Sequence, residues 1–304
     1  MVDVKKQHEN DTGIFNHKPL KMTTWNRIAL TPGVVYVLLV CIIPVLYLLR
    51  FSFSEYKHGS MELSGFTLEN YIDFFTDSYY VDLLISTLVM ALIISFITIF
   101  LAYPVAYYLV RVKSKVVRVV AVLVYLPLMA STVVTSFGWQ SLLTDSGFVN
   151  NLLMAIGIID EPLKLMYNRT GVYIAMIAAN MPYMVVQIRN SLKSIDPFTI
   201  QASKTMGANS VRTFFYVTLP LSLPGISAGV TLVFVSAMSA FVTPTLIGGG
   251  RVNTLGSLIY NQVTVAANFQ FASAVAFILL VVAFAIMYIN NRVFESKRLG
   301  GGGR

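Results

Sequence analysis

The chain has 304 residues, of which 56% are hydrophobic and only 12% are charged. Because soluble domains carry roughly 25% charged residues, this composition excludes an ordinary soluble domain and predicts an all-α protein that crosses a membrane several times. The net charge of +8 would also suit a nucleic-acid binder. The basic residues lie mostly beside apolar runs, however, where membrane orientation explains them better.

Six apolar runs are long enough, or nearly long enough, to cross a bilayer, which takes about 20 apolar residues in a helix. They predict membrane spans at about 28–50, 83–110, 119–143, 170–190, 223–247 and 269–291. The first run is too long for the core of a signal peptide, so an uncleaved first span is expected. The whole membrane domain is expected over 28–293, between a tail at 1–27 and a tail at 294–304.

Basic residues are distributed unevenly between the two sides of this expected bundle. Seventeen of the 22 Lys and Arg residues lie in the N-terminal tail, in the segments 111–118 and 189–212, and at the C-terminal end, 292–304. These segments share one side of the membrane, which predicts that both termini are cytoplasmic. Nine of the 14 acidic residues lie on the other side, six of them within the outer loop 51–82. That charge would either concentrate a cationic solute or help to dock a partner protein.

A polar segment at 191–222 separates the fourth and fifth expected spans. Asp196 is a favourable helix N-cap and Pro197 fits the first turn of the helix that follows. Gly207 then predicts a left-handed end to that helix. The segment is therefore expected to begin with a short helix closed by a glycine turn.

A second short helix is expected after the glycine turn. Asn209 or Ser210 would cap it, and Pro220 is expected to end it, so that span five starts near residue 223. The two helices and the turn between them, 196–220, are termed the elbow. The sequence has no Gly-x4-Gly-Lys-Ser/Thr phosphate loop. Energy must then reach this chain through contact with a partner, and the elbow is the expected place for it.

The elbow resembles the signature of the membrane subunits of binding-protein-dependent ABC importers, which is Glu-Ala-Ala, three residues, Gly, nine residues, Ile-x-Leu-Pro. The spacing fits without a gap. Two positions depart from the signature, because Gln201 stands where Glu is usual and Ser203 stands where Ala is usual. The carboxylate that would make an ion pair with an ATPase is therefore missing. The resemblance assigns ATPase coupling to Gln201, Ala202, Ser203, Gly207, Leu219 and Pro220.

Three further stretches, 138–153, 181–185 and 241–250, resemble permeases of the spermidine/putrescine branch. The resemblance covers about 115–270 and implies the type I ABC importer permease fold, with six membrane helices and a cytoplasmic coupling helix. It implies a transport subunit that has no ATPase site of its own and forms half of a pore for polyamines. Similar permeases carry ferric iron, aminoethylphosphonate or other small solutes, so these cargoes remain alternatives.

The resemblance also implies partners and a location. The expected partners are a second permease, more often a different chain than a second copy, and two cytoplasmic ATPase subunits that bind ATP and Mg. A solute-binding protein is expected outside, and the location is the bacterial inner membrane. No cofactor is expected in this chain itself. No metal is expected either, because its three histidines are scattered through polar flanks.

The expected spans carry no Asp, Glu, Lys or Arg in their middle. This argues against an ion-coupled secondary transporter, which usually places charges there, and no nucleophile–base pair supports an integral-membrane enzyme. A charged cargo would then be held by polar and aromatic side chains, although helix packing or interfacial anchoring explains each of them equally simply. The candidates are Thr135, Ser136 and Trp139 in span three, Asn180, Tyr183 and Gln187 in span four, and Ser236, Ser239, Phe241 and Thr243 in span five. Tyr183 is the strongest, because Pro182 beside it is expected to make the helix irregular.

Overall fold

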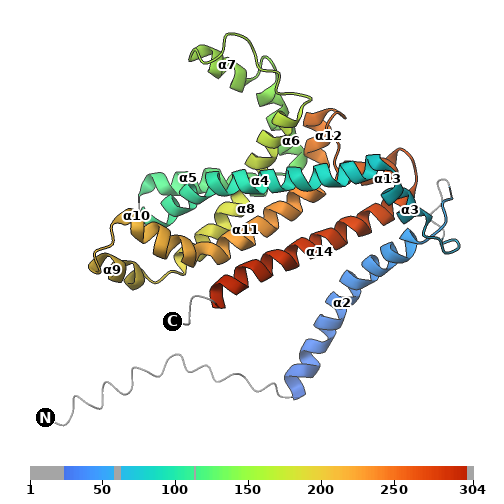
Figure 1. The fold of residues 1–304 in the computed structure, drawn as a ribbon, viewed down its shortest axis with the longest axis horizontal. Coiled ribbons are helices and arrows are strands. Elements are labelled where there is room, and N and C mark those ends of the chain that lie inside the picture. The colour runs from blue at the N-terminus through green and yellow to red at the C-terminus, as the bar shows by residue number, and fades with distance from the viewer. Residues whose placement is uncertain (1–23, 58–62, 113, 300–304) are drawn as a thin grey trace. The chain divides into compact units, whose positions relative to one another are not determined.

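The computed structural model describes residues 24–57, 63–112 and 114–299, and all regular elements among them are helical (Figure 1). The predicted all-α class is confirmed. The chain divides into two units, 1–48 and 49–304. The first unit contains most of α2 (Thr24–Ser52), which has no separate polar face, as expected for a helix in lipid. The tail predicted at 1–27 lies mostly outside the described residues.

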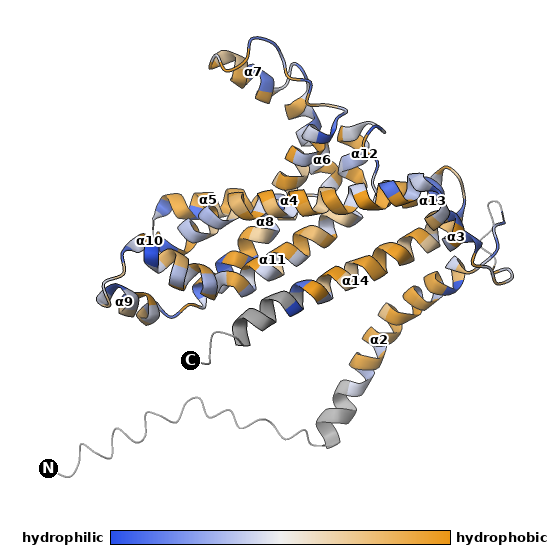
Figure 2. Ribbon diagram, viewed as in Figure 1, coloured by the Kyte–Doolittle hydropathy of each residue, from blue (hydrophilic) through white to orange (hydrophobic). Residues whose placement is uncertain are grey.

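The second unit contains the remaining helices. The long ones are α4 (Ser78–Arg111), α8 (Arg169–Lys193), α11 (Leu219–Ser239) and α14 (Phe269–Leu299). The short ones are α3 (Glu69–Thr76), α5 (Lys115–Tyr125), α6 (Thr132–Leu143), α7 (Phe148–Ala155), α9 (Pro197–Thr205), α10 (Ser210–Thr213), α12 (Val242–Gly248) and α13 (Leu255–Thr264). Two turns complete the order, the 3-10 turn η1 (Leu126–Met129) and the π-helical turn η2 (Phe214–Thr218). Hydrophobic residues run along α4, α11 and α14, and polar residues gather at α9 and α10 (Figure 2).

The core of the second unit is the crossing of α8 with α4 and α11, which pack against each other as well. Its fully buried side chains include Ile94, Met184 and Phe234. Helix α11 approaches α8 closely at Gly225, where an added Cβ would lie only 2.6 Å from the Gln187 carbonyl oxygen. Small residues allow such close helix crossings in membranes. The two helices that flank the elbow, α8 and α11, are therefore in direct backbone contact.

The third predicted span, 119–143, is not one straight helix. The chain bends by 114° between Lys115–Met129 and Thr132–Ala155. Pro127 is the second residue of the 3-10 turn at the bend, and because it has no N–H it cannot continue the helical hydrogen bonds. Ser131 then caps α6 by accepting a hydrogen bond of 3.2 Å from the backbone N–H of Val133. Within the described residues, five helices and this one bent pair are long and apolar enough to cross a membrane.

The prediction that Pro220 ends the second elbow helix is wrong. Ser210–Ser239 is one continuous helical stretch. The π-helical turn η2 makes this possible, because there the N–H of Leu219 donates to the carbonyl of Phe214, five residues back. The wider turn accommodates the proline, which has no N–H to donate and whose ring would clash with a regular α-turn.

The fifth span also ends earlier than the predicted residue 247. Helix α11 stops at Ser239 because Ala240 is extended, with φ −66° and ψ 134°. The Ala240 carbonyl accepts a hydrogen bond of 2.9 Å from the Thr254 hydroxyl, which also caps α13. Pro244 lies in the first turn of the next helix, α12, where proline is tolerated.

Candidate functional site: the elbow and a hydroxyl-lined pocket

The first helix of the elbow, α9, is capped at both ends. The Asp196 carboxylate accepts a hydrogen bond of 2.9 Å from the backbone N–H of Phe198, so the predicted N-cap is confirmed. At the other end Gly207 has φ +85°. The N–H of Gly207 donates to Lys204 O and the N–H of Ala208 donates to Ser203 O, at 3.0 and 3.1 Å. This is the Schellman arrangement, which satisfies the last carbonyls of the helix.

One face of α9 is exposed along its whole length. Phe198, Gln201, Ala202 and Thr205 are exposed on it, at helical spacing, and Ile200 is buried on the opposite side. The Phe198 side chain is 74% exposed although it is large and apolar. Exposed apolar groups on a projecting helix are typical of a surface that another protein covers. The four residues are termed the α9 face.

The base of the elbow rests on the end of α4. The Phe214 ring lies edge-on to Tyr103 and Tyr107, with centroids 5.6 and 5.9 Å away. The Tyr103 hydroxyl forms a hydrogen bond of 3.0 Å with the hydroxyl of Ser222 in α11. Because the second elbow helix is also continuous with α11, a displacement of the elbow must move α11 and strain its contacts with α4.

Ser203 is one of the two departures from the signature. It connects the two helices of the elbow, which are termed its first and second arms. Its hydroxyl donates to the Ile200 carbonyl at 2.8 Å and lies 3.1 Å from the hydroxyl oxygen of Thr213 in the second arm. Thr213 is 4% exposed, so this contact is shielded from water. Sequence reasoning missed this role. The only signal was a hydroxyl at a position that usually carries a methyl group.

We expect Ser203→Ala to loosen the elbow without unfolding the protein. Loss of one hydrogen bond costs about 1 kcal/mol, and this bond is the only side-chain hydrogen bond that joins the two arms among the described residues of the elbow. Hydrogen exchange of the backbone amides in 197–213 should become faster. Thr205→Ala is the matched control, because the Thr205 hydroxyl bonds only within its own helix, to Gln201 O at 3.1 Å. Equal exchange in the two variants would contradict the bracing role of Ser203.

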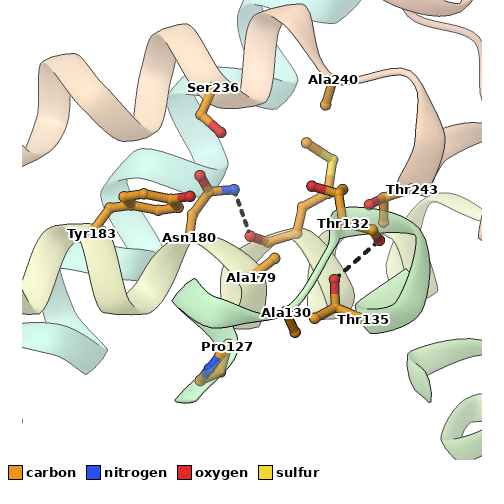
Figure 3. A pocket seen from close by; sticks show the side chains of 11 residues that line it. Pro127, Ala130, Thr132, Thr135, Ala179, Asn180, Tyr183, Ser236, Ala240 and Thr243 are labelled. Carbon is orange, nitrogen blue, oxygen red and sulfur yellow. Dashed lines mark hydrogen bonds between the residues drawn. The ribbon is translucent and has the colours of Figure 1, made fainter. Parts of the chain in front are cut away.

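A second candidate feature is a pocket of about 90 Å³ between η1, α6, α8, α11 and α12 (Figure 3). Hydroxyl groups dominate its polar lining, and none of its side chains is acidic or basic. The lining residues are Pro127, Ala130, Thr132, Thr135, Met176, Ala179, Asn180, Tyr183, Ser236, Ala240 and Thr243. This set is termed the hydroxyl pocket. Its members come from segments far apart in the sequence, so the pocket depends on the bend at Pro127 and on the early end of α11.

Several of the predicted path residues meet in the hydroxyl pocket. These are Thr135, Asn180, Tyr183, Ser236 and Thr243. The sequence reasoning missed Thr132, which precedes Thr135 by three residues and so lies on the same face of α6. That spacing was the signal that could have found it. Ser136, another candidate, supports the wall from behind, with its hydroxyl 2.8 Å from that of Thr243.

The other predicted path residues lie elsewhere. The Phe241 ring stacks on Tyr260, with centroids 5.0 Å apart. Gln187 lies at the α8–α11 crossing, where its Cβ would be 3.6 Å from a Cβ added to Gly229. Trp139 packs against the main core, and the Ser239 hydroxyl bonds within its own helix. None of these four lines the hydroxyl pocket.

Asn180 carries an unmatched acceptor in the pocket wall. The residue is 4% exposed, and its amide nitrogen donates to the Met176 carbonyl at 2.8 Å. Its side-chain oxygen is buried and has no hydrogen-bond partner among the described residues. Because the Met176 carbonyl can only accept a hydrogen bond, the Asn180 amide nitrogen must face it, and the Asn180 side-chain oxygen must then face away from Met176. In Figure 3 the Asn180 amide lies between the side chains of Tyr183 and Ser236.

The irregularity expected at Pro182 does not interrupt α8. The helix runs without interruption from Arg169 to Lys193. The proline is buried in the packed side of the helix, and neighbouring helices help to tolerate proline in membrane spans. The prominence of Tyr183 therefore rests on its place in the pocket and not on an irregular backbone.

Comparison with known proteins places this chain in a family. Residues 97–299 match the family described as binding-protein-dependent transport system inner membrane component. The spermidine/putrescine transport system permease protein PotB of Haemophilus influenzae is 28% identical over 259 residues, which are 84% of this chain and 90% of that protein. PotB of Escherichia coli K12 is 29% identical over 247 residues, 81% of this chain and 90% of that protein.

Solved structures agree on the fold. A bacterial alginate ABC transporter, in complex with its alginate pentasaccharide-bound periplasmic protein, contains a chain with a TM-score of 0.74 and 19% identity, covering 99% of both chains. The inward-facing MetNI methionine ABC transporter gives a TM-score of 0.55 at 18% identity, over 71% of this chain and 95% of that chain. The predicted type I importer permease fold is confirmed. The chain belongs to the family of binding-protein-dependent transport system inner membrane components, and it is the permease subunit of an ABC importer.

Proposed function

We propose that this permease carries polyamines and is driven through its elbow. The observation that carries the proposal is the α9 face, which is exposed on a helix capped at both ends. The second arm, which follows the glycine turn after α9, is continuous with α11. A partner that grips this face can move α11 as a rigid element. The chain itself supplies no phosphate loop, so hydrolysis is assigned to partner subunits that bind ATP and Mg.

The proposed assembly contains two cytoplasmic ATPase subunits and an outer solute-binding protein. A second permease chain, different from this one, completes the pore. The concentration of Lys and Arg in the tails and in 111–118 and 189–212 supports cytoplasmic termini and a cytoplasmic elbow. Family membership supports the same set of partners. The α9 face would contact the ATPase by shape and apolar surface, because Gln201 cannot form an ion pair.

Polyamines are the proposed cargo because the PotB proteins, which match 84% and 81% of this chain, are spermidine/putrescine permeases. The outer face supports a cationic cargo. Glu55, Glu69, Asp73 and Asp77 are all exposed on the outer loop, and a surface of one sign raises the local concentration of the opposite charge. A putative 2-aminoethylphosphonate permease, PhnU of Salmonella typhimurium, is 26% identical over only 56% of this chain. 2-Aminoethylphosphonate is therefore the alternative cargo in the test.

The test is uptake into proteoliposomes that contain the complete complex, with ATP inside and the loaded binding protein outside. Labelled spermidine and putrescine should accumulate only with ATP, and the loaded binding protein should stimulate hydrolysis. Unlabelled polyamine should compete with the label, and 2-aminoethylphosphonate should not. Accumulation without the ATPase subunits would contradict coupling through the elbow, and stimulation by 2-aminoethylphosphonate alone would overturn the cargo assignment.

A further inference from the structure

We infer that the hydroxyl pocket binds an ammonium end of the cargo, with the Asn180 side-chain oxygen as its principal acceptor. This inference rests on the proposed polyamine function and adds the place and chemistry of a transit site. The central observation is the buried Asn180 oxygen, which lacks a partner among the described residues although burial of an unpaired acceptor is costly. A ligand that donates hydrogen bonds removes that cost.

The other polar groups of the pocket also favour a donating ligand. The Thr135 hydroxyl hydrogen is directed to the backbone carbonyls of Ser131 and Thr132, at 3.2 and 3.0 Å. Its oxygen lone pairs therefore remain for a ligand. Thr243 shares one hydrogen bond with Ser136, at 2.8 Å. An ammonium group, with up to three donors and no acceptor, matches this set of oxygens.

The pocket excludes anions by its composition. None of the residues that line it is Lys or Arg, so a phosphonate or carboxylate would lose its hydration without gaining a counter-charge. Tyr183 adds an aromatic ring that is 44% exposed, and such a ring attracts a cation to its face. The lining thus selects a positive, donor-rich group over an anion of the same size.

Because its lining has no carboxylate, the pocket is better suited to brief binding of an ammonium group during transport than to tight retention of it. A buried ion pair would hold an ammonium tightly, because its partner would otherwise be left as an uncompensated charge. Neutral oxygens bind it more weakly and leave no such charge when it departs. The pocket volume of about 90 Å³ has room for an ammonium group together with the carbons next to it.

The test compares Asn180→Leu and Asn180→Asp in the complete reconstituted complex. Asn180→Leu keeps the number and branching of the side-chain heavy atoms and removes the acceptor. The maximal putrescine uptake rate, at saturating loaded binding protein, should fall more than about tenfold, as expected for loss of a hydrogen bond to a charged group. Asn180→Asp keeps the shape and adds a fixed charge. After free putrescine is washed away, this variant should retain about tenfold more label than the wild type.

Asn290→Leu is the matched control, since Asn290 donates to Ser227 and Thr231 at an interhelical contact away from the pocket. It should not change the amount of retained label. The inference is overturned if Asn180→Leu transports at the wild-type rate, as a merely hydrated oxygen would allow. It is also overturned if Asn180→Asp retains no more label than the wild type. Absence of polyamine uptake by the wild-type complex would instead refute the proposed function itself.

Discussion

Gly207→Val is expected to uncouple ATP hydrolysis from uptake. Gly207 has φ +85°, a left-handed conformation that costs an ordinary residue about 1–2 kcal/mol and a β-branched residue more. No atom lies within 4 Å of an added Cβ, so the whole effect comes from the backbone. The turn must rearrange, and α9 then points away from its partner. Uptake should fall at least about tenfold, while basal hydrolysis continues without stimulation by the binding protein.

Gly207→Asn is the control that separates backbone strain from bulk. Asn occupies the same open space as Val but adopts the left-handed conformation far more readily. Its uptake should stay within about twofold of the wild type, the change expected when less than 1 kcal/mol is lost. Equal loss of uptake in the Asn and Val variants would show that the turn conformation is not what couples the two activities.

Gly225→Ala is expected to have the largest effect on stability. The new Cβ would lie 2.6 Å from the Gln187 carbonyl oxygen and 2.4 Å from the Ser191 Cβ. The carbonyl belongs to the α8 backbone and cannot move aside, so the α8–α11 crossing must open. Overpacking of this kind costs about 1–3 kcal/mol or more. Thermal unfolding of the purified complex should shift down by several degrees, and uptake should be lost.

Gly229→Ala, one turn further along α11, is the matched comparison. Its new Cβ would also come within 2.4 Å of a neighbour, but that neighbour is the Met184 sulfur, at the end of a flexible side chain. Methionine adapts to irregular gaps at little cost. This variant should unfold within about two degrees of the wild type, as for a loss well below 1 kcal/mol. Equal destabilisation by the two substitutions would show that the crossing is not limited by backbone contact.

The features that sequence predicted best are those fixed by local chemistry. Asp196 caps α9 as expected, because a carboxylate beside a helix N-terminus meets free N–H groups whatever the rest of the fold does. Gly207 adopts the predicted left-handed conformation for a similarly local reason. The all-helical class and the importer fold followed from composition and from the elbow signature.

The features that sequence missed depend on how separate segments accommodate each other. The helix continues through Pro220 because the π-helical turn before it accommodates the proline ring. The presence of a proline in the sequence does not by itself predict such a turn. The bend at Pro127 lies within an apolar run that predicts one continuous span, and the end of α11 at Ser239 is held by the Thr254 hydroxyl, which binds the Ala240 carbonyl from 14 residues further along the chain. These two breaks create the hydroxyl pocket, which explains why residue type identified only part of its lining. Gln187 and Phe241, which were predicted for the substrate path, lie outside this pocket.

The central claim, that the α9 face receives the ATPase, is tested most directly by photo-cross-linking in the assembled complex. A photoreactive phenylalanine analogue at Phe198, which is 74% exposed on α9, should capture the ATPase subunit. The same analogue at Phe96, which is 62% exposed in the α4 span, should capture lipid and no ATPase. The account is contradicted if the Phe198 variant remains active in ATP-driven uptake and yields no ATPase adduct, or an adduct no stronger than that from Phe96.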